Sequence, residues 1–108
     1  MNYIEIEKDL IPYSFEIDLA DEEYEIEVHH NNRFDFFTID LSKDGVQLVL
    51  GEKLMLDRPL FDGLTHIDLP KVKIIPIDRA GEANRITYDN LESTVFLYLF
   101  EGDNDGSI

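Results

Sequence analysis

Apolar and polar residues alternate with a period of two along much of the chain. The alternation is clearest over residues 24–28 and recurs over residues 4–7 and 15–19. Because successive side chains of a strand point to opposite faces, each run predicts a strand with one buried face and one face of carboxylates. Glutamate is intrinsically unfavourable in strands, so packing of the alternate apolar residues decides the structure of these segments.

The next part of the chain predicts a meander. Asparagine tolerates positive φ, so residues 29–33 predict a turn, and a strand is expected from Phe34 to Leu41. That strand is apolar on both faces in its first half, which predicts a bulge or a central position in the sheet. The glycine-containing loop over residues 42–45 then predicts a hairpin whose partner strand runs from Val46 to Leu50.

Two further strands are expected in the second half of the chain. Residues 72–77 change phase around Pro76, and a strand that contains proline is expected at a sheet edge. Residues 94–100 are apolar on both faces, which predicts a central strand or a strand that another chain covers. One face carries Val95, Leu97 and Leu99, and the other carries Phe96, Tyr98 and Phe100.

These patterns predict an all-β fold, either a small antiparallel sandwich or a partly open barrel of about seven to eight short strands. No long window keeps apolar residues at helical spacing without an interrupting Gly, Pro or β-branched cluster, so at most one short helix is expected. The sequence has no internal repeat and no linker. We expect a single β domain over residues 1–100 and a flexible acidic tail over residues 101–108.

Composition and charge narrow the function classes. The chain has 108 residues, 44% of them hydrophobic, which suits one packed core, and its net charge is −15. The acids concentrate in residues 1–42 and 86–108, whereas residues 43–85 are neutral on balance. Such a field repels nucleic acid and anionic membrane surfaces and would attract a basic protein partner.

The absence of cysteine excludes disulfides, thiolate metal sites and cysteine nucleophiles. The N-terminus carries acids where a secretion signal needs basic residues, and no apolar run reaches membrane-spanning length. We therefore expect a protein with no recognisable export signal.

Three groups of residues resemble metal sites only in part. Residues 101–108 match the opening of an EF-hand calcium loop but lack its closing carboxylate and flanking helices. Glu25, Glu27 and His29 share one strand face at a spacing that could hold zinc, and His66 and Asp68 have the same two-residue spacing. Histidines beside acids on an exposed strand are ordinarily surface residues. We expect no metal site and no cofactor.

No catalytic motif is present. The serines lie in turn, loop or tail contexts without a histidine nearby in sequence, and no Gly-x-Ser-x-Gly turn or Gly-rich phosphate loop occurs. With 24 acids, carboxylate pairs are too numerous to indicate a glycosidase site. The sequence predicts that the protein is not an enzyme and has no small-molecule substrate.

The meander has a strand and turn pattern made up of Tyr24, Ile26, Val28, Asn31, Phe34, Phe37, Ile39, Leu41, Asp44, Gly45, Leu50, Gly51, Pro59 and Leu60. The closing segment adds Asn90, Leu91, Val95, Leu97 and Tyr98. These patterns cover nearly the whole chain and resemble the small baseplate plug proteins of contractile-tailed phages and prophages. The chain has Phe36-Phe37 where the family usually carries Trp, and Glu92 where a glycine is common.

The resemblance implies a structural tail component in the baseplate hub at the tip of the tail tube, where it contacts hub or spike proteins. It also implies a location in the virion after assembly in the cytoplasm of a bacterial host. The expected protein interface is Phe96, Tyr98 and Phe100, with Glu25 and Glu27 as further contacts. The alternative is a small β-barrel module that binds a ligand or a basic protein.

Overall fold

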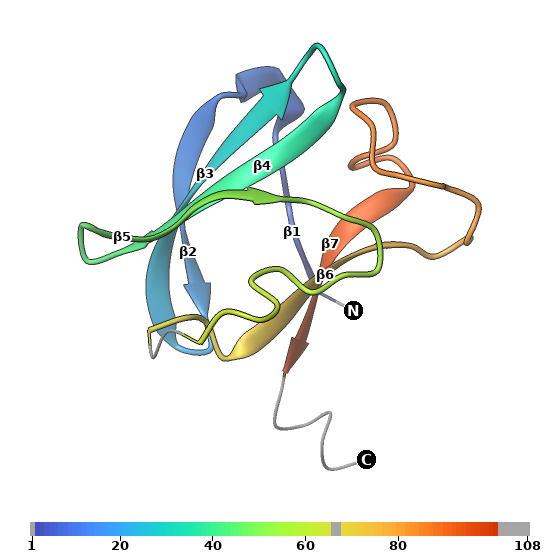
Figure 1. Cartoon of the computed structure of the whole chain (residues 1–108). Coiled ribbons are helices and arrows are strands. Elements are labelled where there is room, and N and C mark those ends of the chain that lie inside the picture. Colours follow the sequence, from blue (N-terminus) through green and yellow to red (C-terminus); the bar gives the residue numbers. More distant parts are fainter. Residues whose placement is uncertain (1, 66–67, 102–108) are drawn as a thin grey trace.

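The structure is a computed structural model, and it describes residues 2–65 and 68–101. Within these residues the chain forms seven β-strands and one 3-10 helix (Figure 1). The elements are β1 (Tyr3–Ile4), η1 (Lys8–Leu10), β2 (Tyr13–Leu19), β3 (Glu22–Asn31), β4 (Phe36–Lys43), β5 (Val46–Lys53), β6 (Val72–Asp78) and β7 (Val95–Glu101). In this part of the chain, no helix has the length and apolar character needed to cross a membrane.

The strands form two antiparallel sheets, which confirms the predicted fold class. One sheet has the order β2-β3-β4-β5 and the other has the order β1-β7-β6, so the described strands do not close into a barrel. A single cluster of buried apolar side chains joins the two sheets. Its most deeply buried members include Leu19, Ile26, Val28, Phe37, Ile39, Leu41, Ile74, Leu91, Val95 and Leu97.

Two hairpins of the four-stranded sheet turn through two residues in the left-handed region. Asp44 and Gly45, with φ of 53° and 79°, connect β4 to β5 as the sequence predicts. Ala20 and Asp21, with φ of 53° and 68°, make the corresponding turn between β2 and β3. Positive φ at both central residues is the geometry that matches the twist of antiparallel strands. Alanine is not a turn residue by preference, so the sequence pattern did not indicate this turn.

The turn between β3 and β4 lies later than predicted. The expected turn over residues 29–33 is wrong in its position, because β3 continues to Asn31 and β4 begins only at Phe36. The carbonyl oxygen of Asn31 accepts the Asp35 N–H at 2.7 Å, and its side-chain oxygen accepts the Phe34 N–H at 3.0 Å. Asp35, with φ of 57°, supplies the left-handed residue.

The strand predicted over residues 34–41 was expected to be central or to contain a bulge, and β4 is central, with an irregularity in its second half. β4 lies between β3 and β5, and its register with β5 shifts between Ile39 and Leu41. Asp40 lies at this irregularity, and its carboxylate accepts the N–H of Gly51 at 2.7 Å. Gly51 has a φ of 74°, a conformation that glycine adopts without strain.

In the three-stranded sheet, β6 is an edge strand and β7 is central, as predicted. The free edge of β6 is covered by the segment that follows β5, where the Asp57 N–H donates to the carbonyl of Pro76 at 2.8 Å. The first strand is shorter than expected: β1 contains only Tyr3 and Ile4, although Ile6 is also buried. The predicted strand over residues 4–7 is therefore wrong in its extent.

A tight turn before β7 is built around Asn90. Its side-chain oxygen accepts the Thr87 N–H at 2.8 Å, and its carbonyl accepts the Val95 N–H at 2.9 Å. Leu91 is fully buried below this turn. Glu92 has a φ of 69°, a conformation that suits glycine and strains a residue with a side chain.

Some predicted features lie outside the described residues. They are His66, the calcium-loop match and the part of the predicted acidic tail beyond Glu101.

Candidate functional site

The outer face of the three-stranded sheet is apolar and mostly aromatic. Alternation turns Val72, Ile74 and Leu97 into the core and their sequence neighbours outward. The apolar outward set is Tyr3, Ile75, Ile77, Phe96, Tyr98 and Phe100, which we call the aromatic face, and the exposed Lys73 lies at its edge opposite Phe100. All three aromatic residues predicted as an interface lie on it.

The aromatic rings of this face contact one another across the strands. The ring of Tyr3 lies 4.8 Å from that of Phe96 and 6.2 Å from that of Tyr98, centroid to centroid. The Arg79 guanidinium lies 5.8 Å from the Tyr98 ring on the same face. Tyr98 is consequently only 7% exposed, whereas Tyr3 is 45% exposed.

Phe96 and Phe100 are half-buried, and so are Ile77, which lies opposite Phe96 on β6, and Ile75, which lies opposite Tyr98. They do not belong to the buried core cluster, which lies on the other side of the sheet. The sheet therefore presents contiguous apolar side chains that neighbouring elements cover only in part. Large contiguous patches of this kind are typical of protein contact surfaces.

The outer face of the four-stranded sheet has the opposite character. Its carboxylates are Glu16, Asp18, Glu23, Glu25, Glu27 and Asp40, which we call the carboxylate face. Strand register places Glu16 directly opposite Glu25, and Asp18 opposite Glu23. Like charges in directly opposed positions destabilise a sheet. Packing of the inner side chains must offset this repulsion.

One histidine lies within contact distance of two residues of the carboxylate face. The Nε2 atom of His29 lies 3.1 Å from a Glu27 oxygen and 3.4 Å from an Asp40 oxygen. The sequence grouped His29 with Glu25 and Glu27, but the structure brings it to Glu27 and to Asp40 of the next strand. Ligand atoms of these three residues lie within 4.8 Å of one another.

A second histidine forms a junction that the sequence did not indicate. His30 donates a hydrogen bond from Nε2 to the Asp35 carboxylate at 2.8 Å, which holds the pKa of Asp35 below its usual value. The same carboxylate accepts the N–H of Tyr88 at 2.9 Å, and the Asp35 carbonyl accepts a hydrogen bond from Arg85. The ring of His30 contacts those of Phe37 and Tyr88, with centroids 4.7 and 5.0 Å away. These contacts fasten the loop before β7 to the β3–β4 turn.

No feature of the described residues forms a recognisable catalytic centre. Among them, no polar or charged side chain belongs to a fully buried residue, and the carboxylate face is exposed to solvent except at the half-buried Asp40. What the geometry offers is two sheet faces of contrasting chemistry, one aromatic and one negatively charged.

Comparison with known families matches the chain to a baseplate protein family. The family model described as cyanophage baseplate Pam3 plug gp18 matches residues 1–103, a range that includes both sheets. No curated protein matches the sequence significantly.

Proposed function

Because the chain belongs to the family of the cyanophage baseplate plug, we propose that it is a structural component of a phage or prophage tail, located in the baseplate. Its neighbours in that position are proposed to be hub or spike proteins at the tip of the tail tube. We further propose that it has no catalytic role. Assembly would take place in the cytoplasm of the bacterial host.

The observation that carries this proposal beyond family membership is the aromatic face. Aromatic side chains are enriched in protein interfaces, and those that become fully desolvated often contribute most of the binding free energy. Phe96 and Phe100 are already held in register by β6 and β7, so little conformational freedom is left to lose on binding. We therefore propose the aromatic face as the principal contact with the rest of the baseplate.

The carboxylate face is proposed as a weaker, electrostatic contact. Glu25 and Glu27 are exposed at its centre and would favour a basic neighbour. Exposed charge pairs are worth little individually, so this face is expected to affect the rate and selectivity of assembly more than its final stability.

The aromatic face can be tested with serine substitutions. Phe96→Ser and Phe100→Ser each remove a half-buried ring, and the expected result is a folded protein that no longer co-purifies with the other baseplate proteins. Leu50→Ser is the matched control, because Leu50 is 71% exposed on the other sheet. The control should assemble as the unchanged chain does.

The proposal fails if both Phe variants keep their β-sheet circular dichroism spectrum and still assemble normally. Should either variant unfold, Tyr3→Ser provides a gentler perturbation, since Tyr3 is 45% exposed on the same face and lies in the short strand β1. Normal assembly of a folded Tyr3→Ser variant would then count against the proposal.

A further inference from the structure

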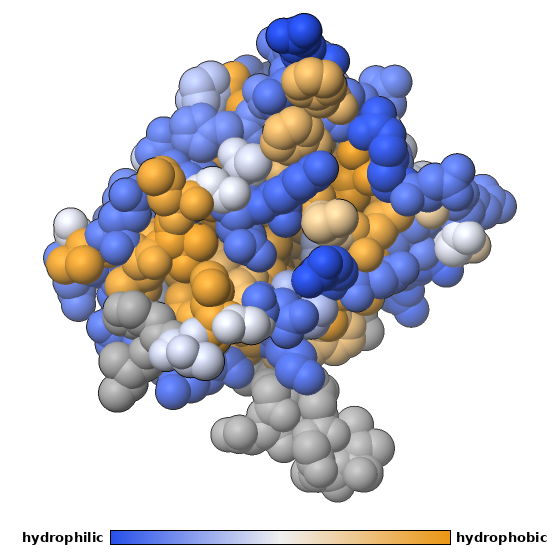
Figure 2. Space-filling model, viewed as in Figure 1, coloured by the Kyte–Doolittle hydropathy of each residue, from blue (hydrophilic) through white to orange (hydrophobic). Residues whose placement is uncertain are grey.

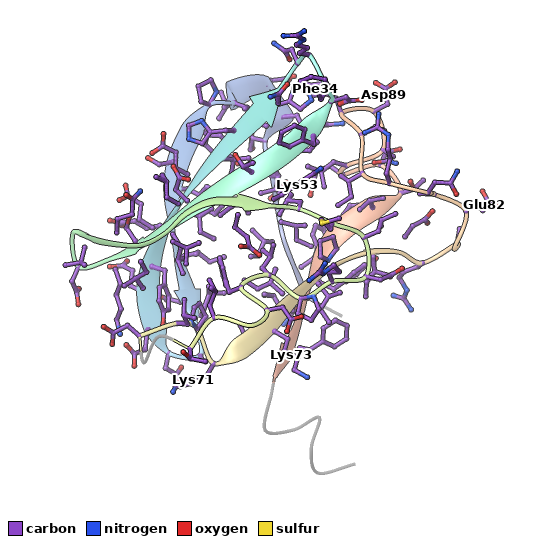
Figure 3. All side chains as sticks on the ribbon, viewed as in Figure 1. Phe34, Lys53, Lys71, Lys73, Glu82 and Asp89 are labelled. Carbon is purple, nitrogen blue, oxygen red and sulfur yellow. The ribbon has the colours of Figure 1, made fainter. Side chains whose placement is uncertain are left out.

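A groove at the end of β4 and β5 runs between the β3–β4 turn, the residues that follow β5 and the loop before β7. Its volume is about 370 Å3. It is lined by Phe34, Phe36, Lys53, Leu54, Met55, Leu56, Asn84, Arg85 and Ile86. Figure 2 shows apolar surface on this side of the molecule, interrupted by hydrophilic side chains. In Figure 3, Phe34 lies at the upper end of this region and Lys53 near its middle.

The groove is apolar inside and at its lip. Leu54 and Ile86 form the floor, at 2% and 4% exposure. Phe34 and Met55 stand at the surface, at 63% and 43% exposure. Covering such exposed apolar side chains with a partner removes them from water, which favours binding.

Basic side chains gather around this apolar groove. The Lys53 ammonium lies 4.6 Å from the Phe36 ring, and the Arg33 guanidinium lies 5.2 Å from the Phe34 ring. Arg58 lies beside Lys53 in the adjoining hollow, which Glu52 and Asp62 also line. Lys53 and Arg85 line the groove itself, and with Arg33 and Arg58 beside it, four of the nine Lys and Arg residues of the chain lie in or next to the groove.

Most of this positive charge has no opposite charge bound to it. Within residues 2–65 and 68–101, none of Arg33, Lys53 and Arg58 forms an ion pair, whereas Lys43 is paired with Glu22. Arg85 lies 3.7 Å from an Asp35 carboxylate oxygen and is held by its bond to the Asp35 carbonyl at 2.8 Å. The guanidinium is therefore fixed in place and still has donors to offer.

We propose that this groove binds a segment of a partner protein in which apolar side chains alternate with or flank carboxylates. The apolar side chains would cover Phe34 and Met55, and the carboxylates would pair with Lys53 and Arg85. Stacking of Lys53 on Phe36 and the bond from Arg85 to Asp35 limit the freedom of both cations before binding, which lowers the entropic cost.

The chemistry favours an acidic peptide over a nucleic acid. At physiological ionic strength charges are screened over about 8 Å, so a short acidic segment interacts mainly with charges beside the groove and only weakly with the carboxylates of β2 and β3. A nucleic acid strand longer than the groove would extend over a protein whose net charge is −15 and would be repelled there. The groove is also too apolar for a phosphate backbone alone.

Fluorescence anisotropy with a labelled probe peptide tests the proposal on the full chain. The probe is a short peptide of alternating Leu and Asp. The expected result is saturable binding, lost when Asp is replaced by Lys in the probe or when Leu is replaced by Ser. Met55→Ser should weaken binding, and the double variant Lys53→Glu, Arg85→Glu should weaken it by at least about tenfold.

The matched control is the double variant Lys71→Glu, Lys73→Glu, which changes the net charge equally but lies away from the groove (Figure 3). It should leave the affinity for the probe unchanged within about twofold. The Phe96→Ser variant should also bind the probe normally, so failure at this groove is distinguishable from failure of the aromatic face.

Three results would overturn the proposal. The first is absence of saturable binding to the unchanged chain, and the second is an equal loss of affinity in the Lys71, Lys73 control. The third is self-association of the chain alone that sedimentation detects and Lys53→Glu abolishes, because the groove would then hold a second copy. If the Arg85 substitution disturbs the fold, the affinity of the Met55→Ser variant for the probe peptide still tests the proposal.

Discussion

The opposed carboxylates of the carboxylate face make a specific prediction about stability. Glu16 on β2 lies directly opposite Glu25 on β3, and both side chains are exposed. Replacing Glu16 by Lys should convert a repulsive cross-strand pair into an attractive one. The variant is therefore expected to be more stable than the unchanged chain, although the substitution lies on a surface.

The size of the effect follows from the register. Side chains in directly opposed positions lie about 5 Å apart. Two unit charges at that separation in water interact by about 0.8 kcal/mol, which salt reduces to about 0.5 kcal/mol. Glu16→Lys replaces this repulsion with an attraction of similar size, so it should stabilise the fold by about 1 kcal/mol at most. That corresponds to a rise in Tm of about 4–8 °C for a domain of this size.

The control for this experiment is Glu82→Lys. Both substitutions raise the net charge by the same amount from −15, but Glu82 lies in the exposed loop after β6, away from β2 and β3 (Figure 3). Thermal unfolding at low and high salt should show a larger gain for Glu16→Lys than for the control, and the difference should shrink as salt rises. Equal gains in the two variants would mean that total charge, not the Glu16–Glu25 pair, sets the effect.

Two further predictions concern groups whose pKa the fold shifts. Burial raises the pKa of Glu92, against a backbone hydrogen bond from Ile6 that lowers it, and one carboxylate oxygen is buried without a partner among the described residues. Glu92→Gln should therefore unfold at a higher denaturant concentration than the unchanged chain near neutral pH. This difference in stability should vanish once pH falls below the unfolded-state pKa of Glu92, and a difference that persists at low pH would contradict the prediction. Backbone N–H groups, that of Ala83 first and then that of Ala80, lower the pKa of Asp78, so its stabilising effect is present near neutral pH and lost as pH falls through the folded pKa. Amide hydrogen exchange at Ala80 and Ala83 should accelerate in Asp78→Ala near neutral pH, and unchanged protection would show that the carboxylate does not hold the loop.

The strands were predictable because their cause is local. Alternation over residues 24–28 and the Asp44-Gly45 hairpin depend on neighbours in sequence, and both appear in the structure as expected. The turn at Ala20 and Asp21 shows the limit of such reasoning. Because Leu19 pairs with Glu22, the two residues between them must adopt positive φ. Packing of the flanking strands imposes this conformation, and the preference of Ala20 does not.

The candidate sites depended on contacts between distant segments and were only partly predictable. Alternation placed Phe96 and Phe100 on one strand face, but the burial of Tyr98 comes from Tyr3, at the other end of the chain. No sequence pattern connects Asp35 to Tyr88, which meet because the loop before β7 folds back over the β3–β4 turn. The basic rim of the groove was also not predicted, because its members are scattered along the sequence.

The central claim is that this chain is a component of the tail baseplate, and its position in assembled tails tests that claim most directly. A tagged chain labelled with gold and viewed by electron microscopy should mark one end of isolated tails, at the tip of the tail tube. Label distributed along the tube or sheath, or absent from purified tails that are otherwise complete, would contradict the account.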